Sequence, residues 1–149
     1  GPWDIAYHVR PRTTNWERTV HFRVRAKVVK EWREAGKRIA KELNLPVGLE
    51  CIGVEVMPVL GTRAMQDNTA CLPSLKAMQD GLVDYGLTFD DGPQYVKWTI
   101  FHAPVYKKGV NALWMRIHDL SNTPIEGIYI EGDELSYEWH GPNEEGRDK

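Results

Sequence analysis

Residues 66–91, QDNTACLPSLKAMQDGLVDYGLTFDD, contain clear signals for the start, the buried face and the end of a helix. Pro73 stands where a helix can begin, because the first-turn amide needs no intrahelical partner. Gly86 is suited to end that helix, since glycine adopts the left-handed capping conformation without strain. Between these two residues, one apolar face recurs at helical spacing and is formed by Leu75, Met78, Leu82 and Tyr85. The stretch therefore predicts a helix over residues 74–85.

Strands are predicted on both sides of this helix. Residues 51–60, CIGVEVMPVL, are apolar and β-branched, which indicates a buried strand. Residues 95–103 and 110–118 follow as two more strands, and residues 125–130 are a candidate short edge strand.

The N-terminal part predicts a strand over residues 3–8, a loop over 9–15 and a long helix over about 23–43. Asn44 and Pro46 end the helix, because proline lacks the amide donor. Its apolar stripe has a gap near Ala35-Gly36 and consists of Val24, Val28, Trp32, Ile39 and Leu43. The β-α-β-α-β-β order predicts the α/β class: a single-domain two-layer α/β sandwich whose helices cover one mixed sheet.

The composition fits one globular domain: 149 residues, of which 42% are hydrophobic. No apolar run approaches the ~20 residues that cross a bilayer, so no membrane partner is expected. Gly1-Pro2 resembles the scar of a removed tag. We assign residues 3–130 to the domain and residues 131–149 to an acidic, flexible tail, and we expect a cytoplasmic protein.

The two cysteines, Cys51 and Cys71, argue against a structural zinc site. Such a site usually takes four Cys or His ligands in tight pairs, and these two are 20 residues apart without a CxxC motif. We expect two buried free thiols.

The charge is unevenly distributed, although the net charge is only −2. Residues 9–41 contain eleven Lys or Arg against three Glu, whereas residues 131–149 contain seven acids and two bases. The basic segment can supply phosphate contacts. A solvated face of an amphipathic helix explains the same charge equally well.

Acidic residues flank the predicted helix of residues 74–85. Asp67 precedes it, Lys76 lies near its first turn, and Asp90-Asp91 follow it. A helix of about twelve residues is ~18 Å long. The acids can meet only if the Gly86 turn sends the chain back along the helix, or if the 61–72 loop folds toward its other end.

The stretch LPSLKAMQDGLVDYGLTFDDGPQYV resembles the core signature of RusA-like Holliday junction resolvases of the phage and prophage type. These carry an acidic loop, a Pro-x-x-Lys start to a helix, an Asp-Gly-Leu-Val-Asp-x-Gly run and an Asp-Asp pair before a strand. The resemblance covers roughly residues 14–120. A bacterial host cell is the expected location if the protein is phage-encoded.

The resemblance implies a role for each matching residue. Asp67 and Asn68 take the place of the family's loop Asp-Asn pair, Lys76 that of the helix lysine, and Asp90 and Asp91 that of the paired metal-binding acids. One departure is Met65, which stands where the family loop often has a further acid.

The chemistry of phosphodiester cleavage fits the same residues. Mg²⁺, for which Mn²⁺ can substitute, takes oxygen ligands and is typically held by one or two carboxylates plus water and phosphate. Asp67, Asp90 and Asp91 can supply these oxygens, and Lys76 is a point charge suited to the scissile phosphate. Without the resemblance, Asp-Asp-Gly after a helix is more often a turn.

Other residues have both a functional and an ordinary interpretation. Asp80 is interpreted as structural, in a surface pair with Lys76. Trp32, Trp98 and Trp114 are expected in the core, and the five histidines form no pair with metal-ligand spacing. The candidate DNA contacts are Trp16, expected in a loop and able to stack on a base, together with Arg10, Arg12, Arg18, His21, Arg23, Lys107 and Lys108.

The sequence thus predicts a Mg²⁺-dependent, structure-selective endonuclease that resolves Holliday junctions by paired symmetric nicks, leaving 5′-phosphates as the resemblance implies. A homodimer is expected, because a four-way junction has two symmetry-related strands to cut. Two alternatives stay open: a broader nuclease for flaps, forks and branched DNA, and a non-catalytic junction-binding protein.

Overall fold

A computed structural model describes residues 2–64 and 66–121. Over these residues the chain forms, in order, β1 (Trp3–Tyr7), α1 (Thr14–Thr19), α2 (Phe22–Glu42), β2 (Ile52–Leu60), α3 (Leu72–Tyr85), β3 (Val96–Phe101), β4 (Val105–Tyr106) and β5 (Ala112–Asp119). The predicted α/β class with helices and a mixed sheet is confirmed. The candidate strand at 125–130 and the tail at 131–149 lie outside the described residues.

Two short elements, α1 and β4, were not predicted. Helix α1 begins where a loop was expected, because the Thr13 hydroxyl accepts a hydrogen bond from the Trp16 amide (3.1 Å) and caps the helix. Trp16 therefore lies in a helix, and the prediction that it lies in a loop is wrong. Strand β4 is a two-residue pairing to β2 that no sequence periodicity can reveal.

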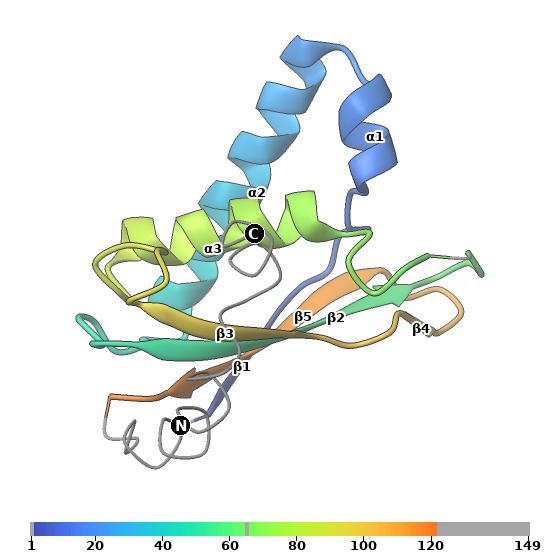
Figure 1. Cartoon of the computed structure of the whole chain (residues 1–149). Helices are drawn as coiled ribbons and strands as arrows, with labels where there is room; N and C mark the ends of the chain where they lie inside the picture. Colours follow the sequence, from blue (N-terminus) through green and yellow to red (C-terminus); the bar gives the residue numbers. More distant parts are fainter. Residues whose placement is uncertain (1, 65, 122–149) are drawn as a thin grey trace, which may run out of the picture.

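The sheet is built around β2. Strand β5 lies antiparallel to it on one side, and β1 lies antiparallel to β5 beyond. On the other side β3 runs parallel to β2, and β4 continues the same edge. The parallel step from β2 to β3 uses α3 as its crossover, which places α3 over the sheet (Figure 1).

The core lies between the sheet and α2 and α3, which cover the same face (Figure 1). Strand residues alternate accordingly, so that Val54 and Val56 are buried and Glu55 between them is only partly buried. Of the three tryptophans expected in the core, only Trp32 is buried there. Trp98 and Trp114 lie partly exposed on the opposite face, with Glu55, so their predicted core position is wrong.

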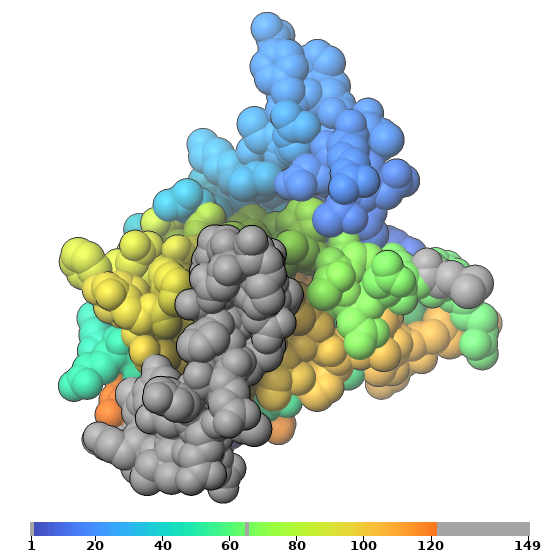
Figure 2. All heavy atoms as spheres, viewed as in Figure 1, coloured from blue at the N-terminus to red at the C-terminus, as the bar shows by residue number. Residues whose placement is uncertain are grey.

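The predicted apolar stripe of the long helix is buried only in its middle. The buried residues of α2 are Val28, Trp32, Ala35, Gly36 and Ala40. At the two ends, Val24 and Leu43 are 48% and 52% exposed. The N-terminal part of α2 rises away from the sheet together with α1, and the pair stands out from the body of the molecule as a helical arm, residues 14–31 (Figures 1 and 2).

Helices α2 and α3 cross at two glycines, which lets their backbones touch. A Cβ on Gly81 would overlap the carbonyl oxygen of Arg33 and come within 2.9 Å of the Lys37 amide. A Cβ on Gly36 would overlap the carbonyl oxygen of Met78. The gap that Gly36 makes in the apolar stripe is therefore a point of backbone contact between the two helices.

We predict that Gly81→Ala destabilises the protein. Alanine favours an isolated helix by about 1 kcal/mol, but here the added methyl group meets backbone atoms that cannot rotate away. The free energy of unfolding should fall by about 2 kcal/mol or more, measured by urea denaturation.

Gly92→Ala is the matched control, because nothing lies within 4 Å of a Cβ at Gly92 and its φ is not positive. It should leave stability nearly unchanged. A Gly81→Ala protein as stable as wild type would contradict the crossing geometry.

Candidate functional site

The turn at Gly86 returns the chain along α3. Gly86 has φ 103° and caps the helix by donating its amide to the carbonyls of Leu82 (3.2 Å) and Val83 (2.9 Å). The next residue, Leu87, is then fixed by donating to Leu82 O and accepting from the Leu49 amide. The chain therefore does turn back at Gly86, as the first of the two routes considered from sequence requires.

This return brings Asp91 beside Lys76. The Lys76 ammonium donates to Asp91 Oδ2 at 3.0 Å, across fifteen positions of sequence. The Asp91 amide in turn donates to Asp90 Oδ1 at 2.8 Å. The lysine hydrogen bond is the main reason that the pKa of Asp91 lies below its ordinary value. The two residues are still open to solvent, with 54% of the lysine side chain and 25% of the aspartate side chain exposed.

Asp80 belongs to the same cluster. It lies one turn after Lys76 on α3, but the lysine bonds to Asp91, so the simple surface pair expected between Lys76 and Asp80 is not the arrangement found. Burial, and next the charge of Asp91, raise the pKa of Asp80. Two carboxylates therefore share the neighbourhood of one lysine, and the cluster has an excess of negative charge.

A hollow of about 200 Å³ opens beside this cluster. It lies where the three helices α1, α2 and α3 meet, and Lys76 and Asp80 form part of its wall. The other lining residues are Thr14, Glu17, Val29, Leu72, Pro73 and Ala77. The charged groups thus face a concave surface large enough for part of a ligand.

Asp67 and Asn68 lie in the loop before α3. The Asp67 carbonyl accepts from the Ala70 amide (3.0 Å), and the Asn68 side chain donates to Phe101 O at the end of β3 (3.5 Å). Over residues 2–64 and 66–121, no three Asp, Glu, His or Cys side chains are grouped as an ion site. The fold brings Lys76 and Asp91 together, but it does not gather Asp67 into one group with Asp90 and Asp91.

Both cysteines are free and buried. Cys71 lies immediately before α3, and its thiol contacts Gln66 Oε1 at 3.3 Å. Burial raises the pKa of this thiol to about 11, so it stays protonated at neutral pH.

The predicted DNA contacts divide into two groups. On the helical arm, Arg18 is exposed, and His21 caps α2 by accepting from the Arg23 amide (3.2 Å). At the base of the arm, the Arg12 guanidinium lies 5.0 Å above the Trp16 ring. Trp16 packs against the core, and Arg12 Nε is buried without a hydrogen-bond partner among the described residues. The exposed Arg18 and Arg23 can reach phosphates, whereas Trp16 is partly buried against the core.

The second group lies at the end of the sheet near β4. Arg10 donates to Thr62 Oγ1 (3.0 Å) and more weakly to Asn111 Oδ1 (3.4 Å), which ties the segment after β1 to this end. Lys107 and Lys108 are exposed in the turn before β5. Arg63, which sequence reasoning did not select, lies here as well. Its charge in the polar 61–72 loop was the signal that could have found it.

A second cluster that the sequence did not reveal lies on the sheet face opposite the helices. Glu55 bridges two histidines, with Oε1 at 2.8 Å from His102 Nε2 and Oε2 at 2.5 Å from His118 Nε2. These hydrogen bonds, the one to His102 first, lower the pKa of Glu55. The histidines looked unrelated in sequence because they come from β5 and from the residue after β3.

The comparisons with known proteins add no family assignment. No protein-family model matches the chain, and no curated protein matches it. Among the described residues, no helix is long and apolar enough to cross a membrane.

We predict opposite effects on stability for two aspartates of α3. The pKa of Asp80 is raised on folding, so its ionised form destabilises the folded state at neutral pH, and the cost disappears as pH falls and the group becomes protonated. Asp80→Asn should therefore raise the thermal midpoint at pH 7 by about 2 °C or more, and the gain should shrink toward pH 4.

Asp84→Asn is the matched control, because Arg33 holds Asp84 with two hydrogen bonds and lowers its pKa. A lowered pKa stabilises the fold above the unfolded-state pKa, and this contribution is lost as pH falls. Asp84→Asn should lower the thermal midpoint at pH 7. If Asp80→Asn lowered it too, the charge crowding inferred for Asp80 would be wrong.

Proposed function

We propose that this protein is a RusA-like, metal-dependent DNA endonuclease that nicks four-way junctions. The observation that carries the proposal is the cluster of Lys76, Asp80 and Asp91 at a hollow between three helices. A cation and several carboxylates at one concave surface are the groups that metal-assisted phosphodiester cleavage requires.

The donor set of the cluster suits Mg²⁺. Asp80 and Asp91 offer hard oxygen ligands, and the pKa of Asp80 is raised first by its burial and next by the charge of Asp91. Asp90 is adjacent, and Asp67 belongs to the loop that precedes the helix. Asp80 and Asp91, with Asp90 next to them, are the residues that would hold the ion, and Asp67 would join them only if its loop moved toward the cluster. When bound, Mg²⁺ or Mn²⁺ would lower the pKa of a water so that it can attack phosphorus.

Each remaining residue has a role set by its position. Lys76 has an ammonium on a flexible stem, more than half exposed, which can contact a non-bridging oxygen of the scissile phosphate and stabilise the charge that builds there. The Asp90 carboxylate accepts from the Asp91 amide and so fixes the orientation of the pair.

The basic groups would hold the DNA backbone on either side. The helical arm supplies Arg18 and Arg23, and the end of the sheet supplies Arg10, Lys107 and Lys108. Such contacts position a duplex without specifying its sequence. Selectivity would then come from the shape of the branched DNA.

The proposal includes a homodimer, because paired symmetric nicks need two equivalent sites on one junction. Light scattering of the purified protein would measure the molar mass directly. A strictly monomeric protein that nicks one strand at a time would favour a flap or fork nuclease.

We predict that Lys76→Met and Asp91→Asn each reduce junction nicking in Mg²⁺ by about 100-fold or more, because each removes a charge from the reacting phosphate or its ion. Junction binding should persist in both variants. Gel assays of a four-way junction, with binding measured in Ca²⁺, would test this. Lys41→Met, at the far end of α2, is the matched control and should cut normally.

A panel of junction, flap, fork and linear duplex substrates separates the alternatives. Equal cutting of linear duplex would rule out a resolvase. A wild-type protein that binds junctions tightly but never nicks them in Mg²⁺ or Mn²⁺ would show a non-catalytic binder.

A further inference from the structure

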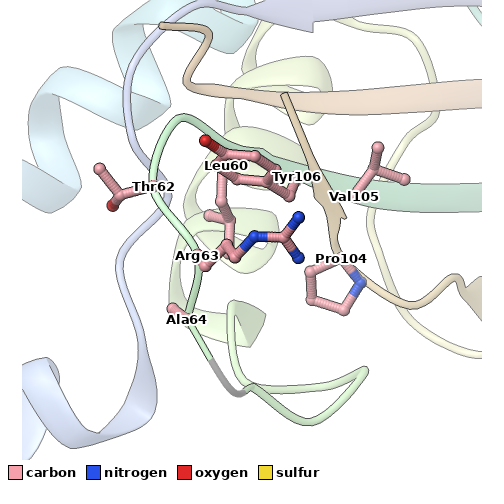
Figure 3. A pocket seen from close by; sticks show the side chains of 7 residues that line it. All are labelled: Leu60, Thr62, Arg63, Ala64, Pro104, Val105 and Tyr106. Carbon is pink, nitrogen blue, oxygen red and sulfur yellow. The ribbon is translucent and has the colours of Figure 1, made fainter. Parts of the chain in front are cut away.

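A pocket distinct from the Lys76 cluster lies between β4 and the chain that follows β2. Its volume is about 410 Å³, and seven residues line it: Leu60, Thr62, Arg63, Ala64, Pro104, Val105 and Tyr106 (Figure 3). A volume of this size is within the range of small-molecule sites. Nothing in the cleavage chemistry proposed above uses it.

Most of the residues that line the pocket are apolar, and its polar groups come from Thr62 and Arg63. The Arg63 guanidinium lies over the Tyr106 ring, 4.6 Å from its centroid, and points into the pocket (Figure 3). Tyr106 and Val105 are large apolar side chains that remain 41% and 43% exposed. Pro104 forms the wall beside them. A stacked cation and ring with free apolar surface can accept another planar group.

The charge around the pocket is positive. Among the described residues that line it, Arg63 is the one that is charged, and none of them is a carboxylate. Arg10 donates to the hydroxyl of Thr62, which is itself a lining residue, and Lys107 and Lys108 follow Tyr106 in the chain. A planar ligand that fits this pocket should therefore carry negative charge close to its ring.

We propose that this pocket binds an unpaired nucleobase of a DNA strand by stacking it on the Arg63–Tyr106 pair. Nucleobases are planar and stack on arginine planes and aromatic rings, and the phosphates on either side would meet Arg10 and the two lysines. A nucleic-acid strand supplies a planar group and a negative charge at every residue, whereas a peptide does so only where it carries aromatic and acidic side chains. The inference rests on the proposed DNA-binding function and adds to it a way to recognise unpaired nucleotides at a branch point.

The test compares two four-way junctions that each have one unpaired nucleotide at the branch point. In one junction this nucleotide carries its base, and in the other it is abasic. Binding is measured without a divalent cation, by fluorescence anisotropy. Wild type should prefer the intact base by about tenfold, because one stacked base contributes roughly 1–3 kcal/mol. Tyr106→Ala and Arg63→Ala should both lose this preference.

Conservative variants separate stacking from charge. Tyr106→Phe keeps the ring and should keep the preference, whereas Arg63→Lys keeps the charge, loses the plane and should lose most of it. When 2-aminopurine replaces the unpaired base, its fluorescence should be quenched on binding of wild type and not on binding of Tyr106→Ala. Circular dichroism of each variant checks that it is folded.

The outcomes distinguish this inference from the function it rests on. If wild type binds and nicks junctions but does not discriminate against the abasic junction, the pocket proposal fails and the nuclease proposal stands. If Tyr106→Ala weakens binding of the junction with an unpaired base and of fully paired DNA equally, the pocket does not stack a base. If wild type binds no DNA at all, both proposals fail.

Discussion

The contact between the backbones of α2 and α3 is the constraint on which the candidate site depends. Gly36 and Gly81 have no side chains, so the two helices approach until the backbone of each meets that of the other. This crossing fixes α3 over the sheet, and α3 carries both Lys76 and Asp80. A bulkier pair of residues would push α3 outward and change its height above β2 and β3.

The cluster of Lys76, Asp80 and Asp91 places two carboxylates that repel each other beside one lysine. Lys76 neutralises Asp91, yet Asp80 is held partly buried beside Asp91 and its pKa is raised. A structural ion pair would be arranged more simply, as in the bidentate contact between Arg33 and Asp84 on the same helix. Crowded carboxylates in a concave region are typical of sites that bind cations or transfer protons.

The fold separates basic residues that are close in sequence and brings together others that are distant in sequence. The fold distributes the basic segment of residues 9–41 over the helical arm, the C-terminal part of α2 and the segment of Arg10, which hydrogen-bonds to Thr62 at the far end of the sheet. Arg63, Lys107 and Lys108 join it there. The Lys76 cluster belongs to α3, which begins below α1 (Figure 1).

The sequence by itself determined the α/β class with a mixed sheet, and it predicted α3 over residues 74–85 where the structure has Leu72–Tyr85, because helical and strand periodicities and capping residues are local signals. It also singled out Lys76, Asp90 and Asp91. Tertiary structure decided which residues meet. The ion pair of Lys76 with Asp91 depends on the return of the chain at Gly86. The positions of Trp98 and Trp114 depend on which sheet face the helices cover. Neither Glu55 with its two histidines nor the Arg63–Tyr106 stack could be foreseen, because their partners come from different strands and only the strand register brings them together.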